Sequence, residues 1–124
     1  MKKIYIFVLL IFFGCAAISP PPGGPEDKTP PQLLSSIPES GTFNINGGLI
    51  VKLIFSERLE ENINKSSIRL LPFEKTPLEF KVKKNIIEVL LPEVLKKNQT
   101  YQLIISREII DERKNKLDKT YQLA

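Results

Sequence analysis

The most reactive side chain of this protein is its single cysteine, Cys15, which follows Gly14 at the end of an apolar run. A thiol can act as a nucleophile, bind a metal, form a disulfide or carry a lipid. Cys15 has no second cysteine with which to form an intramolecular disulfide. The surrounding sequence therefore has to distinguish among the other uses.

The segment before Cys15 is organised like a secretory signal. Lys2 and Lys3 precede 10 uncharged residues, 4–13. As a helix this run would span about 15 Å, roughly half of a ~30 Å hydrocarbon core. It is too short for a stable transmembrane helix but has the length of a signal-peptide core. Two alternatives are a cleaved signal followed by an incidental cysteine, and an N-terminal hairpin of core strands.

The four residues from Phe12 to Cys15 resemble the lipobox of bacterial lipoproteins. That resemblance implies cleavage between Gly14 and Cys15, diacylation of the thiol and acylation of the new amino terminus. One acyl chain holds a protein to a membrane only marginally, whereas two or three give an effectively permanent anchor. We therefore expect a lipoprotein signal peptide over residues 1–14 and attachment to a membrane through acyl chains on Cys15.

The residues after Cys15 predict a flexible tether over 15–29. The stretch 16–29 reads AAISPPPGGPEDKT, in which three prolines favour polyproline II and two glycines add a flexible joint. Fully stretched at ~3.1 Å per residue, it would reach on the order of 43 Å. A merely disordered N-terminus fits the composition equally well. We expect one folded domain over 30–124, held away from the membrane.

Composition removes several kinds of chemistry. The chain has no histidine, which is the commonest general base and metal ligand. Without Lys2 and Lys3 the mature chain keeps 16 basic against 14 acidic residues, and no basic stripe carries interleaved aromatics. Nucleic acid is therefore not expected as a partner. With Cys15 acylated, an enzyme would have to work with carboxylates alone, so we expect no catalytic residues, no cofactor and no small-molecule substrate.

From residue 30 onward the apolar residues recur with a period of two, which indicates half-buried strands. Turn residues at 39–41, 47–48, 84–85 and 96–98 separate the runs. The fold class predicted is all-β, an Ig-like antiparallel β-sandwich of about seven short strands. The stretches expected to contain them are 33–37, 48–57, 68–71, 78–84, 86–91, 100–106 and 121–123.

Two connecting segments have a different character. The acidic residues after Ser56 favour a helix of at most one or two turns there. Residues 107–119 are rich in charge and predict a long loop between the last two strands.

Four stretches together resemble a known family. DKTPPQLLSSIPESG, IVKLIFSERL, LKKNQTYQLII and IIDERKNKL occur in the order of a bacterial Ig-like domain of the SbsA type. The resemblance covers Asp27 to about Leu117 and implies a non-catalytic module of a cell-envelope lipoprotein. In that family the last strand is usually longer and further sequence often follows.

A few polar residues in these stretches have alternative interpretations. Tyr101 follows the Asn98 corner, which predicts a tyrosine corner whose hydroxyl returns to nearby backbone. Asn98 begins a formal glycosylation sequon, but a turn is the favoured role. Glu57, Asp111 and Asn115 could offer oxygen ligands to calcium, although the 111–115 stretch also has the composition of an ordinary turn. We predict structural roles for Tyr101 and Asn98 and no metal site.

These features favour a non-catalytic, lipid-anchored Ig-like module of the bacterial envelope that acts as a spacer or binds an envelope protein or glycan. Acidic residues do not directly follow Cys15, which favours the periplasmic face of the outer membrane. Two alternatives stay open. The chain could be the N-terminal part of a larger envelope protein, or a secreted glycan hydrolase with two carboxylates at one cleft.

Overall fold

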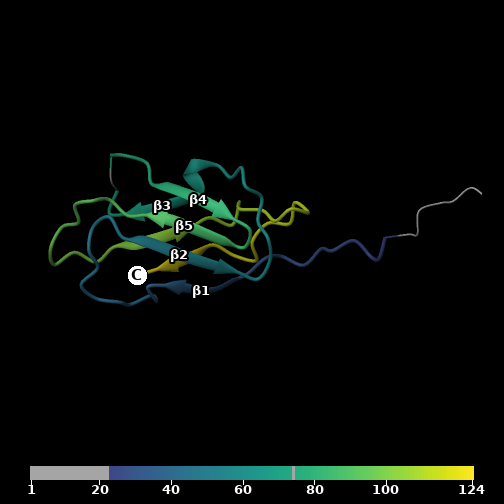
Figure 1. Ribbon diagram of the computed structural model, residues 1–124, viewed down its shortest axis with the longest axis horizontal. Helices are drawn as coiled ribbons and strands as arrows, with labels where there is room; N and C mark the ends of the chain where they lie inside the picture. The colour runs from purple at the N-terminus through teal and green to yellow at the C-terminus, as the bar shows by residue number, and fades with distance from the viewer. Residues whose placement is uncertain (1–22, 74) are drawn as a thin grey trace, which may run out of the picture.

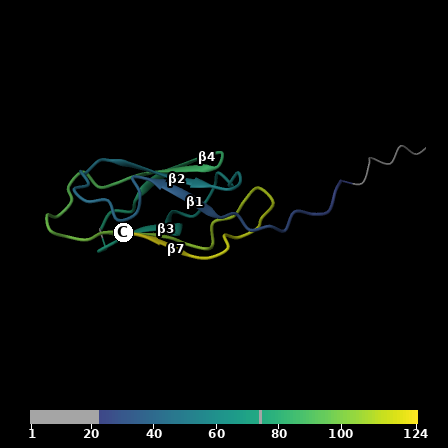
Figure 2. The same cartoon turned by 90° about the horizontal axis from the view of Figure 1, so that it is seen from below.

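The described residues form two antiparallel sheets packed face to face. The computed structural model describes residues 23–73 and 75–124, so Gly14 and Cys15 lie outside it. One sheet has the order β1-β2-β5-β4 and the other β3-β6-β7, and Figure 2 shows them as two layers. The predicted seven-stranded sandwich is thereby confirmed. The strands are β1 (Leu33–Ile37), β2 (Ile50–Phe55), β3 (Ile68–Leu71), β4 (Glu79–Lys83), β5 (Ile86–Leu90), β6 (Gln102–Ile105) and β7 (Tyr121–Leu123).

The core lies between the sheets and is built from alternate residues of the strands. On β2 and β5, Leu53 lies opposite Ile87 in the register, and both side chains are fully buried. The facing sheet contributes Ile68 opposite Ile105, again with almost no exposure. Each such side chain contributes roughly 1.5–3 kcal/mol through burial. The period of two therefore specifies which face of β2, β3 and β5 points inward. Strand β1 has an irregular register and β6 buries three successive residues, so these two depart from strict alternation.

The segment after Ser56 differs from the expected helix. The single helical element of the described residues is a 3-10 turn at Lys65–Ser67, further along the chain. Leu59 is buried instead, and its N–H donates to the Lys84 carbonyl over 3.0 Å. The Glu60 N–H donates to the Ile110 carbonyl over 3.0 Å. Because these N–H groups bond to distant segments, they cannot form helical i→i−4 bonds.

The long connection between β6 and β7 does contain the predicted turn, but it is not simply a solvated loop. Ile109 and Leu117 are fully buried, and the Leu117 N–H donates to the Ile109 carbonyl over 3.0 Å. This short hairpin, whose tip is charged, closes one end of the sandwich. Among the described residues, no helix has the length and apolar character needed to cross a membrane.

Candidate functional site

The two ends of the sandwich differ in the segments that they carry, and we call them the tether pole and the cleft pole. Residues 23–32 lead away from the domain at the tether pole, where residues 56–60 and 107–119 also lie (Figure 1). The cleft pole is at the opposite ends of the strands and carries the loops 38–49 and 91–101 (Figure 1). Strand β1 runs from the first pole to the second. Any ligand bound at the cleft pole is therefore remote from the chain that leads to Cys15.

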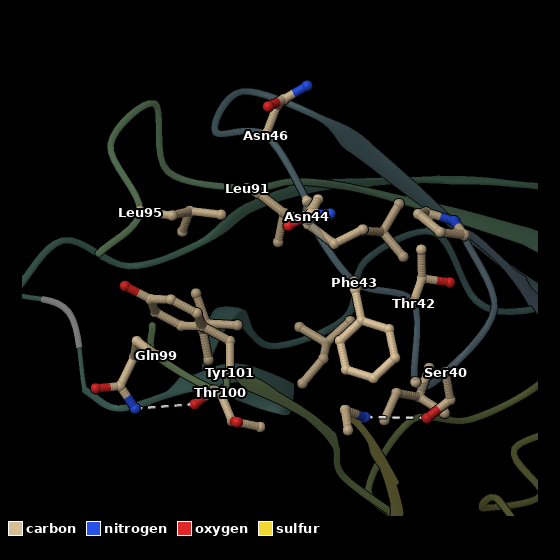
Figure 3. Close-up of a pocket in the computed structure, with 18 of the residues that line it drawn as sticks. Ser40, Thr42, Phe43, Asn44, Asn46, Leu91, Leu95, Gln99, Thr100 and Tyr101 are labelled. Carbon is tan, nitrogen blue, oxygen red and sulfur yellow. Dashed lines mark hydrogen bonds between the residues drawn. The ribbon is translucent and has the colours of Figure 1, made fainter. Parts of the chain in front are cut away.

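A cleft of about 890 Å³ opens at the cleft pole between the two sheets. Its walls come from the loops 38–46 and 95–101, and its floor is the end of the hydrophobic core (Figure 3). Phe43 stands on one side and Tyr101 on the other (Figure 3). Phe43 is 88% exposed, an unusual state for a large aromatic side chain. The cleft is thus an apolar hollow with an aromatic group at its rim.

Hydrogen bonds and tight turns hold the two walls in place. Gly41, at φ 87°, donates its N–H to the Ala124 carbonyl over 2.8 Å, and the Ala124 N–H donates to the Ser40 hydroxyl over 3.0 Å. On the other wall, the Lys96 N–H donates to the Tyr101 hydroxyl over 2.9 Å. Asn98 adopts φ 54° between them, which an asparagine tolerates in a turn. One wall is therefore held by bonds to the end of β7, and the other by local turn chemistry.

Most of the polar side chains that line the cleft are uncharged. Glu39 is the single acidic residue among the described residues that line it, and Lys96 and Lys97 are the basic ones. The described lining therefore lacks the pair of carboxylates that a glycan hydrolase needs. The neutral polar side chains are Ser36, Ser40, Thr42, Asn44, Asn46, Asn98, Gln99 and Thr100.

The possible calcium ligands lie together at the tether pole, but both carboxylate oxygens of Asp111 already accept hydrogen bonds there. Asp111 is buried, and its Oδ1 accepts from the N–H groups of Arg113 and Asn115, both at 2.8 Å. The Asn115 side-chain amide donates to Asp111 Oδ2 over 3.0 Å and to the Asp27 carbonyl over 2.9 Å. This geometry is that of a turn that also fixes the chain before β1. In the parts of the chain that are described, no group of three or more His, Cys, Asp or Glu side chains could hold a metal ion.

Glu57 lies beside this turn, and its surroundings disfavour its charge. Burial raises the pKa of Glu57 above its ordinary 4.5, and the nearby carboxylates of Asp27 and Asp111 raise this pKa further. The structure thus gathers the predicted trio of Glu57, Asp111 and Asn115 and adds Asp27, which sequence reasoning had not included.

Sequence reasoning missed the most exposed part of the cleft. The stretch TFNIN, residues 42–46, places an aromatic residue between polar neighbours in a connection between two strands. That isolated Phe43 was the available signal. The corner at Asn98 and Tyr101 was predicted as a structural feature, but not that it faces Phe43, because the two walls lie about half the domain apart in sequence.

Seven strands in two antiparallel sheets with a tyrosine at the β6 corner define an Ig-like domain. The model of the bacterial Ig-like domain family matches residues 27–124. The chain belongs to that family. No curated protein matches the chain.

Proposed function

We propose that the chain is a lipid-anchored Ig-like module of the SbsA type in the bacterial cell envelope, and that its cleft binds a neutral envelope glycan. The expected domains support the anchor: a signal over 1–14, lipid on Cys15 and a tether to residue 29. The family to which residues 27–124 belong supports a non-catalytic role. The outer membrane, at its periplasmic face, is the proposed location.

The observation that carries the binding role is the position of the cleft at the pole opposite the tether. A protein tethered at one end presents its other end to the surrounding envelope. The strands of the domain are about 17 Å long, and the tether adds further reach. A module that served only as a spacer would not need an aromatic group exposed at this pole.

The lining of the cleft favours a glycan. A sugar ring has apolar C–H faces, which pack on aromatic rings, and hydroxyls, which bond to amides and hydroxyls. Phe43 and Tyr101 supply the rings, while Asn44, Asn46 and Gln99 supply amides that can both donate and accept. The low charge of the lining favours a neutral section of polysaccharide.

The binding role is tested with the full chain in liposomes and purified cell-wall polysaccharide, by co-sedimentation. Phe43→Ala is expected to weaken binding roughly tenfold, because truncation of an aromatic anchor costs more than about 1 kcal/mol. Phe73→Ala is the matched control, since Phe73 is also exposed, at 76%, but does not line the cleft. Equal binding by wild type and Phe43→Ala would contradict the glycan site.

The anchor is tested separately by growing cells with a labelled fatty acid. Wild-type chain is expected to incorporate the label and Cys15→Ser to lose it. Surface proteolysis of intact cells then reports on which membrane face the domain lies, with protection expected for the periplasmic face. Equal labelling of the two chains would refute the lipid anchor and leave the glycan site to its own test.

A further inference from the structure

The outer face of the four-stranded sheet combines apolar and charged side chains in a regular pattern. We call this surface the outer face; its central residues come from alternate positions of β2 and β5, which lie in the middle of the sheet (Figure 1). The register makes three rows across these two strands. The rows are Ile50 with Leu90, Lys52 with Glu88, and Ile54 with Ile86.

The two flanking rows are apolar although they face outward. Ile50 is 48% exposed and Leu90 40%, and Ile37 on the neighbouring strand β1 is 57% exposed. Ile54 and Ile86 are half-buried by their neighbours on the sheet. A cluster of aliphatic side chains on the solvent side of an antiparallel sheet departs from the usual polar alternation. Such a cluster is typical of an interaction surface.

The middle row carries two opposite charges, and only one of them, Glu88, has an ion-pair partner among the described residues. Glu88 Oε2 lies 3.0 Å from Lys83 Nζ on the hairpin neighbour β4. Lys52, directly across from Glu88 in the register, forms no ion pair within the described part of the chain. Its ammonium group is therefore available to a carboxylate from outside.

We propose that a second copy of this chain packs on the outer face, related by a two-fold axis that runs along the strands midway between β2 and β5. This rotation places β2 of one copy over β5 of its partner. Each Lys52 then faces the partner's Glu88, so that the dimer has two identical ion pairs. The rotation also sets Ile50 over Leu90 and Ile54 over Ile86, apolar on apolar. The central rows formed by β2 and β5 are self-complementary in charge and in polarity, as an isologous interface requires. The edge strands are not, because Ile37 on β1 comes over the partner's Lys81 on β4.

The twist of the sheets is compatible with this arrangement. Sheets packed face to face differ in strand direction by about 30°, which displaces the ends of the strands more than their centres. The Lys52 and Glu88 pair forms the middle row, where the displacement is smallest. The ion pairs thus set the register, and the isoleucine and leucine rows supply the apolar contact.

The size of the face predicts a weak, reversible dimer. Four strands about 4.8 Å apart and about 17 Å long cover roughly 300 Å² in plan. A standard interface buries about 800 Å² on each partner, so this contact belongs with small and transient interfaces. The fraction of dimer is therefore expected to rise as the protein concentration is raised toward the millimolar range.

The test uses reversed charges on full chains that carry either of two affinity tags, mixed in non-ionic detergent. Lys52→Glu sets glutamates against the partner's Glu88, and Glu88→Lys sets lysines against the partner's Lys52. Each single variant should lose at least about tenfold of its self-capture, because like charges in contact disfavour association strongly. A mixture of the two single variants should recover it, since every contact then joins a glutamate to a lysine.

Arg69→Glu is the matched control, because it reverses an exposed strand charge on the opposite sheet. It should capture wild-type chain normally. Circular dichroism melts of each variant establish that it is folded. Recovery of capture in the mixture is a second, independent sign of folding, because unfolded chains could not form the interface. The proposal is overturned if wild type shows no self-capture at any concentration. It is equally overturned if the mixed single variants pair no better than each does with itself.

Discussion

Tyr121 on β7 and Leu33 on β1 link the edges of the two sheets. The Leu33 N–H donates to the Tyr121 hydroxyl over 3.1 Å, and this hydroxyl donates to Asp118 Oδ1 over 2.6 Å. Burial, followed by the hydrogen bond to Asp118, raises the pKa of Tyr121 above its ordinary 10.0. One phenol thus ties the first strand, which continues the tether, to the last.

Tyr121→Phe is expected to lower the free energy of unfolding by about 1–2 kcal/mol, because the Leu33 N–H loses its acceptor. Since the folded-state pKa is raised, the contribution of Tyr121 is fully present below pH 10 and is lost as pH rises through that pKa. Urea unfolding of both chains against pH measures this. A difference in stability that stays constant through the alkaline range would contradict the role of the neutral hydroxyl.

Glu57→Gln is expected to raise the melting temperature at neutral pH. Because the folded-state pKa of Glu57 is raised, its charge opposes folding above that pKa, and the cost disappears below 4.5. The gain from glutamine should therefore shrink as the solution is acidified. Glu61→Gln, at an exposed neighbouring position, serves as the control in the same thermal scans. A gain that is independent of pH would show that charge is not its cause.

Gly47→Ala is expected to destabilise the domain by about 1–3 kcal/mol, as overpacking does. A Cβ at Gly47 would overlap the backbone carbonyl of Glu93, which cannot move aside as a flexible side chain could. The adjacent Gly48 N–H donates to the Pro92 carbonyl over 2.9 Å, so the chain after one wall of the cleft approaches the chain before the other. Chemical denaturation compares it with Gly24→Ala, where the added methyl meets nothing within 4 Å. Equal stability of the two variants would refute the close contact.

Leu117→Ala is expected to cost about 2–5 kcal/mol, because it leaves a cavity in the core. The residue belongs to a segment whose charge predicts a loop, yet its side chain is fully buried. Lys119→Ala, two positions later and exposed, removes only a cation–π contact of 5.2 Å with the Tyr121 ring and should cost no more than about 1 kcal/mol. Urea unfolding midpoints provide the measurement, and a small effect at Leu117 would mean that the hairpin does not belong to the core.

The sequence predicted the strands well because each is a local pattern. Alternation over a few residues, with Gly, Asn and Pro between the runs, was enough to locate all seven strands and the turns at 40–41, 47–48 and 97–98. It failed after Ser56, where the helical preference of the acidic residues gave way to backbone bonds with Lys84 and Ile110. Local propensity is weak when a buried residue such as Leu59 must reach the core.

The tertiary structure alone decided what lies beside what. The cleft exists because loops 38–46 and 95–101 meet at one pole. Lys52 and Glu88 lie opposite each other in the register because β2 is adjacent to β5. Sequence patterns report which face of a strand is apolar, since that depends on neighbours two residues away. They do not report which strand lies adjacent, because pairing is the result of the packing of the whole chain.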